Sequence, residues 1–224
     1  MQGCFSLLML KQVLESPHIN PKNAFRLLLA MHIAGAIGLA IPESRALFQM
    51  LTPFNLLATA AIVFHFEEKK NAGYIILLFV TFLVGFGIEV AGVHTGAVFG
   101  EYAYGATLGF KLWEVPLAIG LNWAVLIYTT GLLSDRLKVP KVIRAIIGAL
   151  LMVVLDYLIE PVAIKFDFWS WSLESIPIKN YIAWFIVSLA LHGLYQVLPF
   201  SKNNPLAIKL LYIQGLFFLI LNFI

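Results

Sequence analysis

Three carboxyl residues are the positions in this sequence best suited to chemistry. Glu89 lies near the end of one long apolar run, and Asp156 and Glu160 lie four residues apart near the end of another. The negative end of a helix and removal from water both disfavour a carboxylate, and two acids on one helical face hinder each other's ionisation. We therefore expect Glu89, Asp156 and Glu160 to hold protons near neutral pH, as general acids must.

Polar and aromatic residues gather in two passages that follow these acids, 94–112 and 165–180. The stretch 85–116 also contains seven of the 16 glycines, and glycine suits tight turns and close approach of the backbone. An irregular polar passage between apolar runs is typical of a binding site. The candidate substrate-binding residues are His94, Thr95, Tyr102, Tyr104, Trp113, Asn122, Trp169, Trp171, Asn180 and Trp184.

Plainer interpretations of these residues stay open at the level of sequence. The acids could pair with Lys111, Lys165 or His94 at a membrane surface, and the tryptophans could form the aromatic belt that is common there. Alternatively, some of the tryptophans wall a pocket in which their ring faces stabilise a cation. Spacing along the chain does not separate these possibilities.

The sequence does not indicate a metal site. His94 stands among the carboxylates, but metal-binding pairs at helical spacing, such as HxxxH or ExxH, are absent around it. The single cysteine, Cys4, excludes an intramolecular disulfide and a cysteine metal cluster. His32 and His192 fall on helix faces that favour a packing role. We therefore predict that no metal is bound.

The composition indicates a membrane protein. Hydrophobic residues make up 61% of the chain and charged residues 12%, whereas about a quarter of the residues in a soluble domain are charged. The apolar residues form long runs and not the short alternations of a barrel. A net charge of +3 without a basic block argues against nucleic acid as a partner. The predicted fold is all-α: a single polytopic transmembrane helical bundle over residues 1–224, with irregular loops rich in Gly and aromatic residues on one face.

A spanning helix needs about 20 mostly apolar residues. Within the second apolar run, Thr52, Pro53 and Asn55 predict a kink or a polar seam. The N-terminal FSLLMLKQVL (5–14) has no basic residue before it, so we do not interpret it as a cleaved signal but as a weakly amphipathic interfacial piece. About seven spans are predicted, at residues 24–41, 46–66, 73–93, 113–133, 142–164, 181–200 and 206–224.

The distribution of basic residues predicts an orientation. Most of the 15 Lys and Arg residues fall in loops on the N-terminal face, whereas Arg45, Lys111, Lys165 and Lys179 fall on the other face. Basic loops remain in the cytoplasm. We therefore expect a bacterial cytoplasmic (inner) membrane protein with its N-terminus in the cytoplasm and its C-terminus outside. The acids and both polar passages then converge at the outer half of the membrane.

Two blocks of the sequence resemble a known family. Residues 89–123, EVAGVHTGAVFGEYAYGATLGFKLWEVPLAIGLNW, are similar to the E-x-x-G-x-x-T-G-x-x-F-G-x-Y-x-Y-x-x-x-L-G-x-x-x-x-x-V-P signature of the membrane carotenoid biosynthesis family, the CruF-type carotenoid hydratases. Residues 155–185 resemble the second block of that family, with its D-x-x-x-[DE]-P, W-x-W and P-x-x-N-Y-x-x-W elements. Glu160 precedes Pro161 where aspartate is the commoner residue, which preserves the acid and lengthens its reach.

The resemblance implies an enzyme that adds water across the terminal isopropylidene double bond of an acyclic carotenoid, giving a tertiary alcohol without a cofactor. Asp156 or Glu89 would donate the proton, and the other would position and deprotonate the water. Asn122, Asn180 and Thr95 would hold that water, while tyrosine and tryptophan rings face the cation. The carotenoid would enter from the lipid phase, so membrane lipids and other carotenoid-pathway enzymes are the expected partners.

Three alternatives remain at this stage. A related carotenoid enzyme could cyclise or isomerise the end group after the same protonation step. A membrane transporter could use Glu89 and Asp156 as a proton relay, although the sequence lacks the paired broken spans typical of many transporters. A pigment-binding scaffold would tolerate neutral replacement of the acids.

Overall fold

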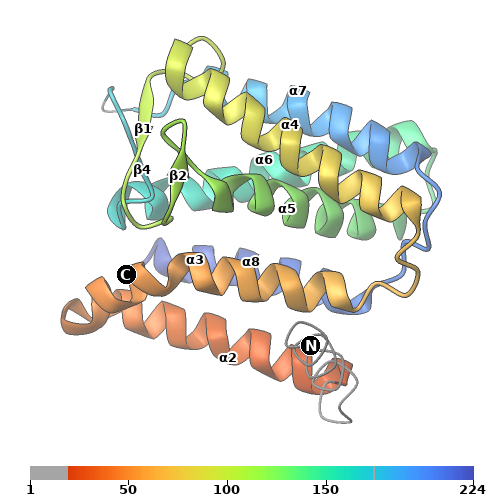
Figure 1. Ribbon diagram of the computed structural model, residues 1–224, viewed down its shortest axis with the longest axis horizontal. Coiled ribbons are helices and arrows are strands. Elements are labelled where there is room, and N and C mark those ends of the chain that lie inside the picture. Colours follow the sequence, from red (N-terminus) through yellow and green to blue (C-terminus); the bar gives the residue numbers. More distant parts are fainter. Residues whose placement is uncertain (1–19, 174) are drawn as a thin grey trace, which may run out of the picture.

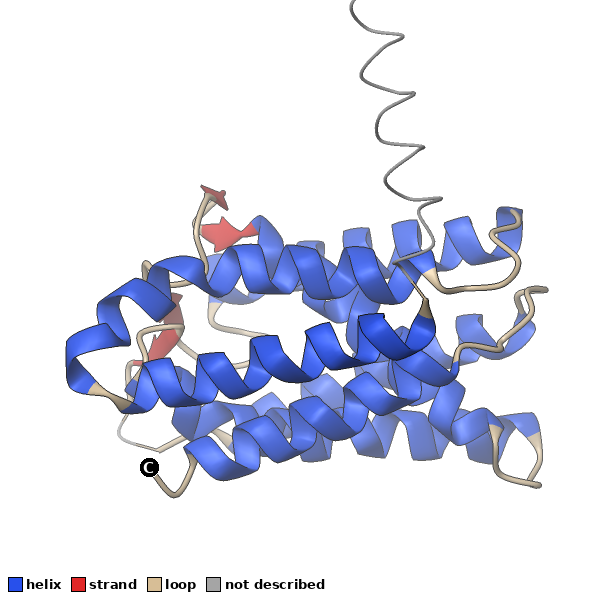
Figure 2. Cartoon of the chain, turned by 90° about the horizontal axis from the view of Figure 1, so that it is seen from below, coloured by secondary structure: helices blue, strands red, loops and turns tan. Residues whose placement is uncertain are grey.

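The computed structural model describes residues 20–173 and 175–224, so the predicted interfacial piece at 5–14 lies outside the described residues. The described chain is dominated by helices that run along one common direction (Figures 1 and 2). The helices are α2 (Pro21–Ala40), α3 (Pro42–His65), α4 (Ala72–Thr95), α5 (Leu117–Asp135), α6 (Lys141–Lys165), α7 (Ile178–Val197) and α8 (Pro205–Leu221).

Asparagine and proline set several of the helix starts. The side chain of Asn20 accepts a hydrogen bond from the backbone N–H of Asn23 at 2.9 Å, and Pro21 occupies the first turn of α2. Asn71 caps α4 and Asn204 caps α8 in the same way. An asparagine oxygen at this position satisfies a backbone donor that the helix itself leaves unpaired, and proline there costs no hydrogen bond.

The helices form two layers (Figure 1). One layer contains α4, α5, α6 and α7, and the other contains α2, α3 and α8. Helix α5 is the centre of the molecule, since it packs against α3, α4, α6, α7 and α8 and is buried around most of its circumference. The chain passes between the layers twice, at residues 66–71 and 198–204, and both passages lie at the end of the bundle away from the strands.

Two short antiparallel strand pairs cover the other end. β1 (Tyr102–Tyr104) pairs with β4 (Trp169–Trp171), and β2 (Lys111–Leu112) pairs with β3 (Val115–Pro116). The passages predicted as irregular loops are therefore partly ordered strands. The predicted start of a span at residue 113 is wrong, because Trp113 and Glu114 have φ of 49° and 64° and form the turn between β2 and β3. Helix α5 starts only after Pro116.

The apolar helices confirm a membrane helical bundle. Five helices, α2 to α6, are long and apolar enough to cross a membrane. Helix α8 has 17 residues, or about 25 Å at 1.5 Å per residue, which is shorter than the roughly 30 Å of a bilayer core. Helix α7 has 20 residues but carries buried polar side chains along its length, including Asn180, Ser188, His192 and Gln196. The count of seven spans stays a prediction.

Candidate functional site

Glu89 on α4 is 3% exposed and is surrounded by hydrogen-bond donors. Its Oε2 accepts from the hydroxyls of Tyr102 at 2.6 Å and Tyr104 at 2.7 Å, and its Oε1 accepts from Nε1 of Trp123 at 3.1 Å. A carboxylate offers about four lone-pair positions. Three of those positions on Glu89 are thus filled by protein donors, which leaves one position on Oε1.

The alternation of strand β1 brings the two tyrosines to Glu89. Residues two apart in a strand point to the same face, so the Tyr-Ala-Tyr sequence buries both rings and exposes Ala103. Burial, reinforced by the nearby Glu89 carboxylate, raises the pKa of both tyrosine hydroxyls above the ordinary value of 10.0. Tyr102 and Tyr104 therefore keep their protons and remain donors to Glu89.

Asp156 and Glu160 lie one helical turn apart on α6, and each is 1% exposed. The side chain of Asn180 on α7 bridges them, since its Nδ2 donates to Asp156 Oδ2 at 2.8 Å and to Glu160 Oε1 at 3.2 Å. Strand β4 supplies two more donors to Glu160 Oε2, from Nε1 of Trp169 at 3.0 Å and of Trp171 at 2.8 Å. Glu160, like Glu89, accepts three hydrogen bonds.

Asp156 differs from the other two acids because its Oδ1 is buried without a hydrogen-bond partner. Among the residues that the structure describes, only one donor, Asn180, reaches this carboxyl group. Leaving a buried polar atom unpaired costs about 1 to 3 kcal/mol, so such an atom in a native structure is explained by a bound water, a ligand or a proton that it carries. Oδ1 of Asp156 is the carboxyl oxygen in this cluster that receives no hydrogen bond from the described residues.

The three acids have no basic partner. In the described part of the chain, no Lys, Arg or His nitrogen lies within 4.0 Å of Glu89, Asp156 or Glu160. Surface ion pairing, the plainer interpretation of the sequence, applies instead to Glu114, which lies 3.9 Å from His94. The cluster is held by neutral donors, which supply hydrogen bonds without neutralising charge.

The acids surround a small hollow, which we call the acidic chamber, with a volume of about 30 Å³. A water molecule occupies roughly 30 Å³ in the liquid and needs several polar partners in a cavity. The acidic chamber therefore has the size and lining of a site for one or two waters. The stacked rings of Trp123 and Trp184, whose centroids are 4.3 Å apart, form part of its wall. Its other lining residues are Glu89, Phe99, Tyr102, Tyr104, Ile119, Asn122, Asp156, Ile159, Glu160, Trp169, Trp171 and Asn180.

The structure brings most of the sequence-predicted residues together at the acidic chamber, but it leaves three outside. His94 is exposed beside Glu114, and Trp113 is 63% exposed at the turn between β2 and β3. The hydroxyl of Thr95 donates to the backbone carbonyl of Ala91 at 2.6 Å on the exposed end of α4. The residues that do line the chamber are Glu89, Asp156, Glu160, Tyr102, Tyr104, Asn122, Trp169, Trp171, Asn180 and Trp184.

Sequence reasoning missed Trp123 as a site residue. Its ring is fully buried in the second turn of α5, and its N–H donates to Glu89. A signal was present, since a tryptophan within an apolar run needs a partner for its indole N–H. Phe99, which was also missed, is one apolar residue among many and carries no such signal.

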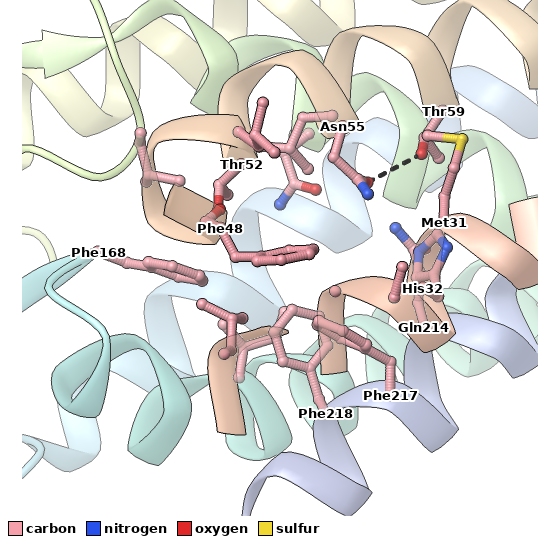
Figure 3. Close-up of a pocket in the computed structure, with 18 of the residues that line it drawn as sticks. Met31, His32, Phe48, Thr52, Asn55, Thr59, Phe168, Gln214, Phe217 and Phe218 are labelled. Carbon is pink, nitrogen blue, oxygen red and sulfur yellow. Dashed lines mark hydrogen bonds between the residues drawn. The ribbon is translucent and has the colours of Figure 1, made fainter. Parts of the chain in front are cut away.

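A larger, mostly apolar hollow lies between the two layers (Figure 3), and we call it the apolar cavity. Its volume is about 280 Å³, and the rings of Phe48, Phe168, Phe217 and Phe218 contribute to its wall. The polar seam predicted on α3 also faces it, where Thr59 Oγ1 donates to Asn55 Oδ1 at 3.3 Å. The apolar cavity and the acidic chamber share four lining residues: Ile119, Asn122, Ile159 and Trp169.

These features define a class of protein: an integral membrane helical bundle with a buried cluster of acids beside a cavity for an apolar molecule. The sequence profile of the carotenoid biosynthesis protein family matches residues 48–223, and the chain belongs to that family. The match includes the whole stretch from α4 to α7, with the strands and loops between these helices, and this stretch supplies every residue that lines the acidic chamber.

Comparison with characterised proteins identifies a distant relative. Over 112 residues the chain is 28% identical to the bisanhydrobacterioruberin hydratase of Haloarcula japonica. The aligned region is 46% of this chain and only 38% of the length of that relative. No solved structure matches the chain. The comparisons thus place the chain in a carotenoid biosynthesis family that it shares with a distant protein named as a hydratase.

Proposed function

We propose that this protein is a hydratase that adds water to the terminal isopropylidene double bond of an acyclic carotenoid. The observation that carries the proposal is Asp156, a buried carboxyl group with an unpartnered oxygen. Asp156 lines a water-sized chamber that borders an apolar cavity. The distant hydratase relative supports the same reaction class.

The first step is proton transfer from Asp156. Oδ1 gives its proton to the CH carbon of the double bond, and the π electrons form the new C–H bond. Positive charge then develops on the neighbouring carbon, which bears two methyl groups and is therefore a tertiary cation. A general acid that needs no cofactor suffices for this step.

The chamber stabilises the cation by charge and by ring faces. The sequence-based expectation that all three acids hold protons is kept here for Asp156 alone, because Glu89 and Glu160 each accept three hydrogen bonds and are assigned the ionised form. Their negative charge lies beside the reacting carbon in a site of low dielectric, where electrostatic stabilisation is strong. The rings of Trp169 and Trp171 add cation–π attraction of about 0.5 to 2 kcal/mol.

Water captures the cation in the second step. Its oxygen bonds to the tertiary carbon, and its proton passes to the remaining lone-pair position on Glu89 Oε1. Asn122 and Asn180, which line the chamber, are suited to orient the water. Return of the proton from Glu89 to Asp156 closes the cycle, so the reaction consumes one water and needs no oxidant or reductant.

The size of the acidic chamber favours hydration over cyclisation. Both reactions begin with the same protonation, but cyclisation requires the polyene to fold back so that a second double bond reaches the cation. The acidic chamber, at about 30 Å³, has room for a water beside an end group that reaches it from the bordering apolar cavity, but not for a polyene folded back on itself.

We further propose that the carotenoid reaches the site from the lipid phase of a bacterial inner membrane. The N-terminus would face the cytoplasm, the C-terminus the outside, and the acidic chamber the outer leaflet. Other enzymes of the carotenoid pathway would then supply the substrate within the same membrane.

The test is expression in bacteria that accumulate lycopene or γ-carotene, followed by mass analysis of the pigments. We expect the wild type to yield products heavier by one or two waters, and the Asp156→Asn variant to lose at least about a hundredfold of this activity, the lower range for removing a general acid. Glu114→Gln is the matched control, because it neutralises an exposed acid near the strands that does not line the chamber. A product of unchanged mass would point to cyclisation or isomerisation, and full activity of Asp156→Asn would exclude the proposed mechanism.

A further inference from the structure

A third hollow lies on the outside of the bundle between α2 and α8, and we call it the α2–α8 groove. Its volume is about 390 Å³, and apart from His32 its lining is entirely apolar. Side chains such as Ile33 and Leu216 are about half exposed there, although nothing polar accompanies them. In a membrane protein such a groove faces the hydrocarbon interior.

His32 and Phe217 line both the α2–α8 groove and the apolar cavity, so the two hollows are neighbours separated by this pair. The rings lie edge to face with centroids 5.5 Å apart. Phe217 lies over Gly35, where an added Cβ would be 3.4 Å from its ring. The side chain of Phe217 thus stands between the membrane and the cavity, and Figure 3 shows it beside His32 and Phe218 at the cavity wall.

The apolar cavity has an independent mark of a binding site. Gln214 on α8 lines it and is 5% exposed, yet its Oε1 has no hydrogen-bond partner. An unpaired amide in a buried wall is costly unless a bound molecule or water satisfies it. In Figure 3, Gln214 and His32 lie at the end of the cavity away from Phe168.

The apolar cavity cannot enclose a whole carotenoid. Pockets for drug-sized ligands measure roughly 300 to 1,000 Å³, and this one measures about 280 Å³. A carotenoid is longer than a drug-sized molecule, so only its end segment fits inside. The rest of the rigid polyene must leave the cavity through a neighbouring hollow. Of the two hollows described here that border the apolar cavity, the acidic chamber is too small and too polar for a polyene, whereas the α2–α8 groove is large and apolar.

We propose that the α2–α8 groove holds the polyene chain of the substrate and that the His32–Phe217 pair is the doorway through which its end group reaches the acidic chamber. The identity of the ligand depends on the hydratase proposal. The route itself depends only on the shared walls of the three hollows.

The test measures binding separately from turnover. Purified protein is equilibrated with phosphatidylcholine vesicles that contain lycopene, and the pigment retained on the protein is measured by its absorbance. Ile33→Trp and Leu216→Trp fill the groove from opposite sides. We expect each to lower the retained lycopene by about tenfold, equivalent to roughly 1.4 kcal/mol. Ile186→Trp is the matched control, since Ile186 is 60% exposed on α7 and lines none of these hollows.

The outcomes separate this route from the hydratase proposal. Equal retention by Ile33→Trp, Leu216→Trp and Ile186→Trp would overturn the route even if the wild type hydrates lycopene. Loss of co-purified phospholipid without loss of lycopene would make the groove a lipid site and would also overturn it. The wild type could retain more lycopene than Ile33→Trp and Leu216→Trp and yet never hydrate it. That result would support the route and count against the hydratase proposal.

Discussion

Asp156, Glu89 and Glu160 share one chamber, but they differ in the number of hydrogen bonds that each carboxyl group accepts. Glu89 accepts hydrogen bonds from β1 and α5, and Glu160 accepts them from β4 and α7. Among the described residues, Asn180 alone donates to Asp156. Donors favour a charged acceptor, and an unpaired oxygen suits a proton. In the proposed mechanism, this contrast between otherwise similar acids separates the proton donor from the two stabilising charges, as environments do in other enzymes with paired carboxyl groups.

The two tyrosines that hold Glu89 predict a dependence of stability on alkaline pH. In the unfolded chain tyrosine ionises near pH 10.0, whereas burial raises the pKa of Tyr102 and Tyr104 in the folded protein. Above pH 10.0 the tyrosines lose their protons in the unfolded chain but keep them in the folded protein. The folded state therefore binds more protons, and the free energy of unfolding falls as the pH rises. We expect the unfolding temperature to drop steadily above about pH 10, as measured by thermal unfolding in detergent.

A phenylalanine variant isolates this effect. Tyr104→Phe removes one of the protonated groups, so the decline above pH 10.0 should be shallower even though the lost bond to Glu89 lowers stability at neutral pH. Tyr212→Phe, at a tyrosine that is 62% exposed, serves as the control. An identical slope in Tyr104→Phe and the wild type would contradict the assignment.

At the scale of elements, helix α4 approaches α5 closely because of glycine. Gly85 and Glu89 are one turn apart, and an added Cβ on Gly85 would lie 2.4 Å from Cβ and Cγ of Trp123. That close approach allows the indole N–H of Trp123 to reach Glu89. Gly92 likewise allows strand β1 to approach α4 closely, since a Cβ there would lie 2.8 Å from the hydroxyl of Tyr102.

The close approach of α4 to α5 at Gly85 predicts opposite effects of two neighbouring substitutions. Gly85→Ala would force α4 and α5 apart, and we expect it to cost about 1 to 3 kcal/mol and to weaken the bond between Trp123 and Glu89. Gly87→Ala meets nothing within 4 Å and should be neutral or stabilise the helix by about 0.5 to 1 kcal/mol.

Thermal unfolding of both variants and their tryptophan fluorescence give the comparison. Equal unfolding temperatures for Gly85→Ala and Gly87→Ala would show that α4 and α5 tolerate separation, and that glycine does not set their distance.

The helices and the acids could be predicted from the sequence because each gives a local signal. Apolar runs mark the helices, and an acid such as Glu89 inside such a run is conspicuous. The pairing of β1 with β4 could not be predicted, since strands of three residues show too little periodicity and their partners are distant in the chain. His94 was misplaced because five residues along a helix rotate a side chain by about 140° from Glu89.

At the scale of the whole molecule, the two layers are fastened at the end opposite the strands. Glu67, in the passage from α3 to α4, is 2% exposed and accepts hydrogen bonds from the hydroxyls of Tyr128 at 2.5 Å and Ser201. Asn204, which caps α8, donates to Tyr128 as well. Both passages between the layers are thereby tied to α5, far from the acidic chamber.

The orientation in the membrane is testable with thiol labelling. In a Cys4→Ser background, Glu101→Cys places a thiol at the exposed end that carries the strands, and Lys138→Cys places one at the exposed opposite end. With the acidic chamber toward the outside, we expect a membrane-impermeant maleimide to label Glu101→Cys in intact spheroplasts and Lys138→Cys only after permeabilisation. The reverse pattern would place the N-terminus outside.

The acidic chamber draws its lining from the contiguous stretch Ala72–Val197, whereas α2, α3 and α8, which flank that stretch in the sequence, supply most of the apolar cavity. Under the proposed function, the residues for the reaction and most of those that contact the pigment are therefore encoded in separate parts of the gene. Lineages that make different pigments could diversify by altering only the flanking segments, with the reactive segment held constant. Chimaeras that exchange those flanks between relatives would then inherit the substrate preference of the donor and the reaction of the recipient.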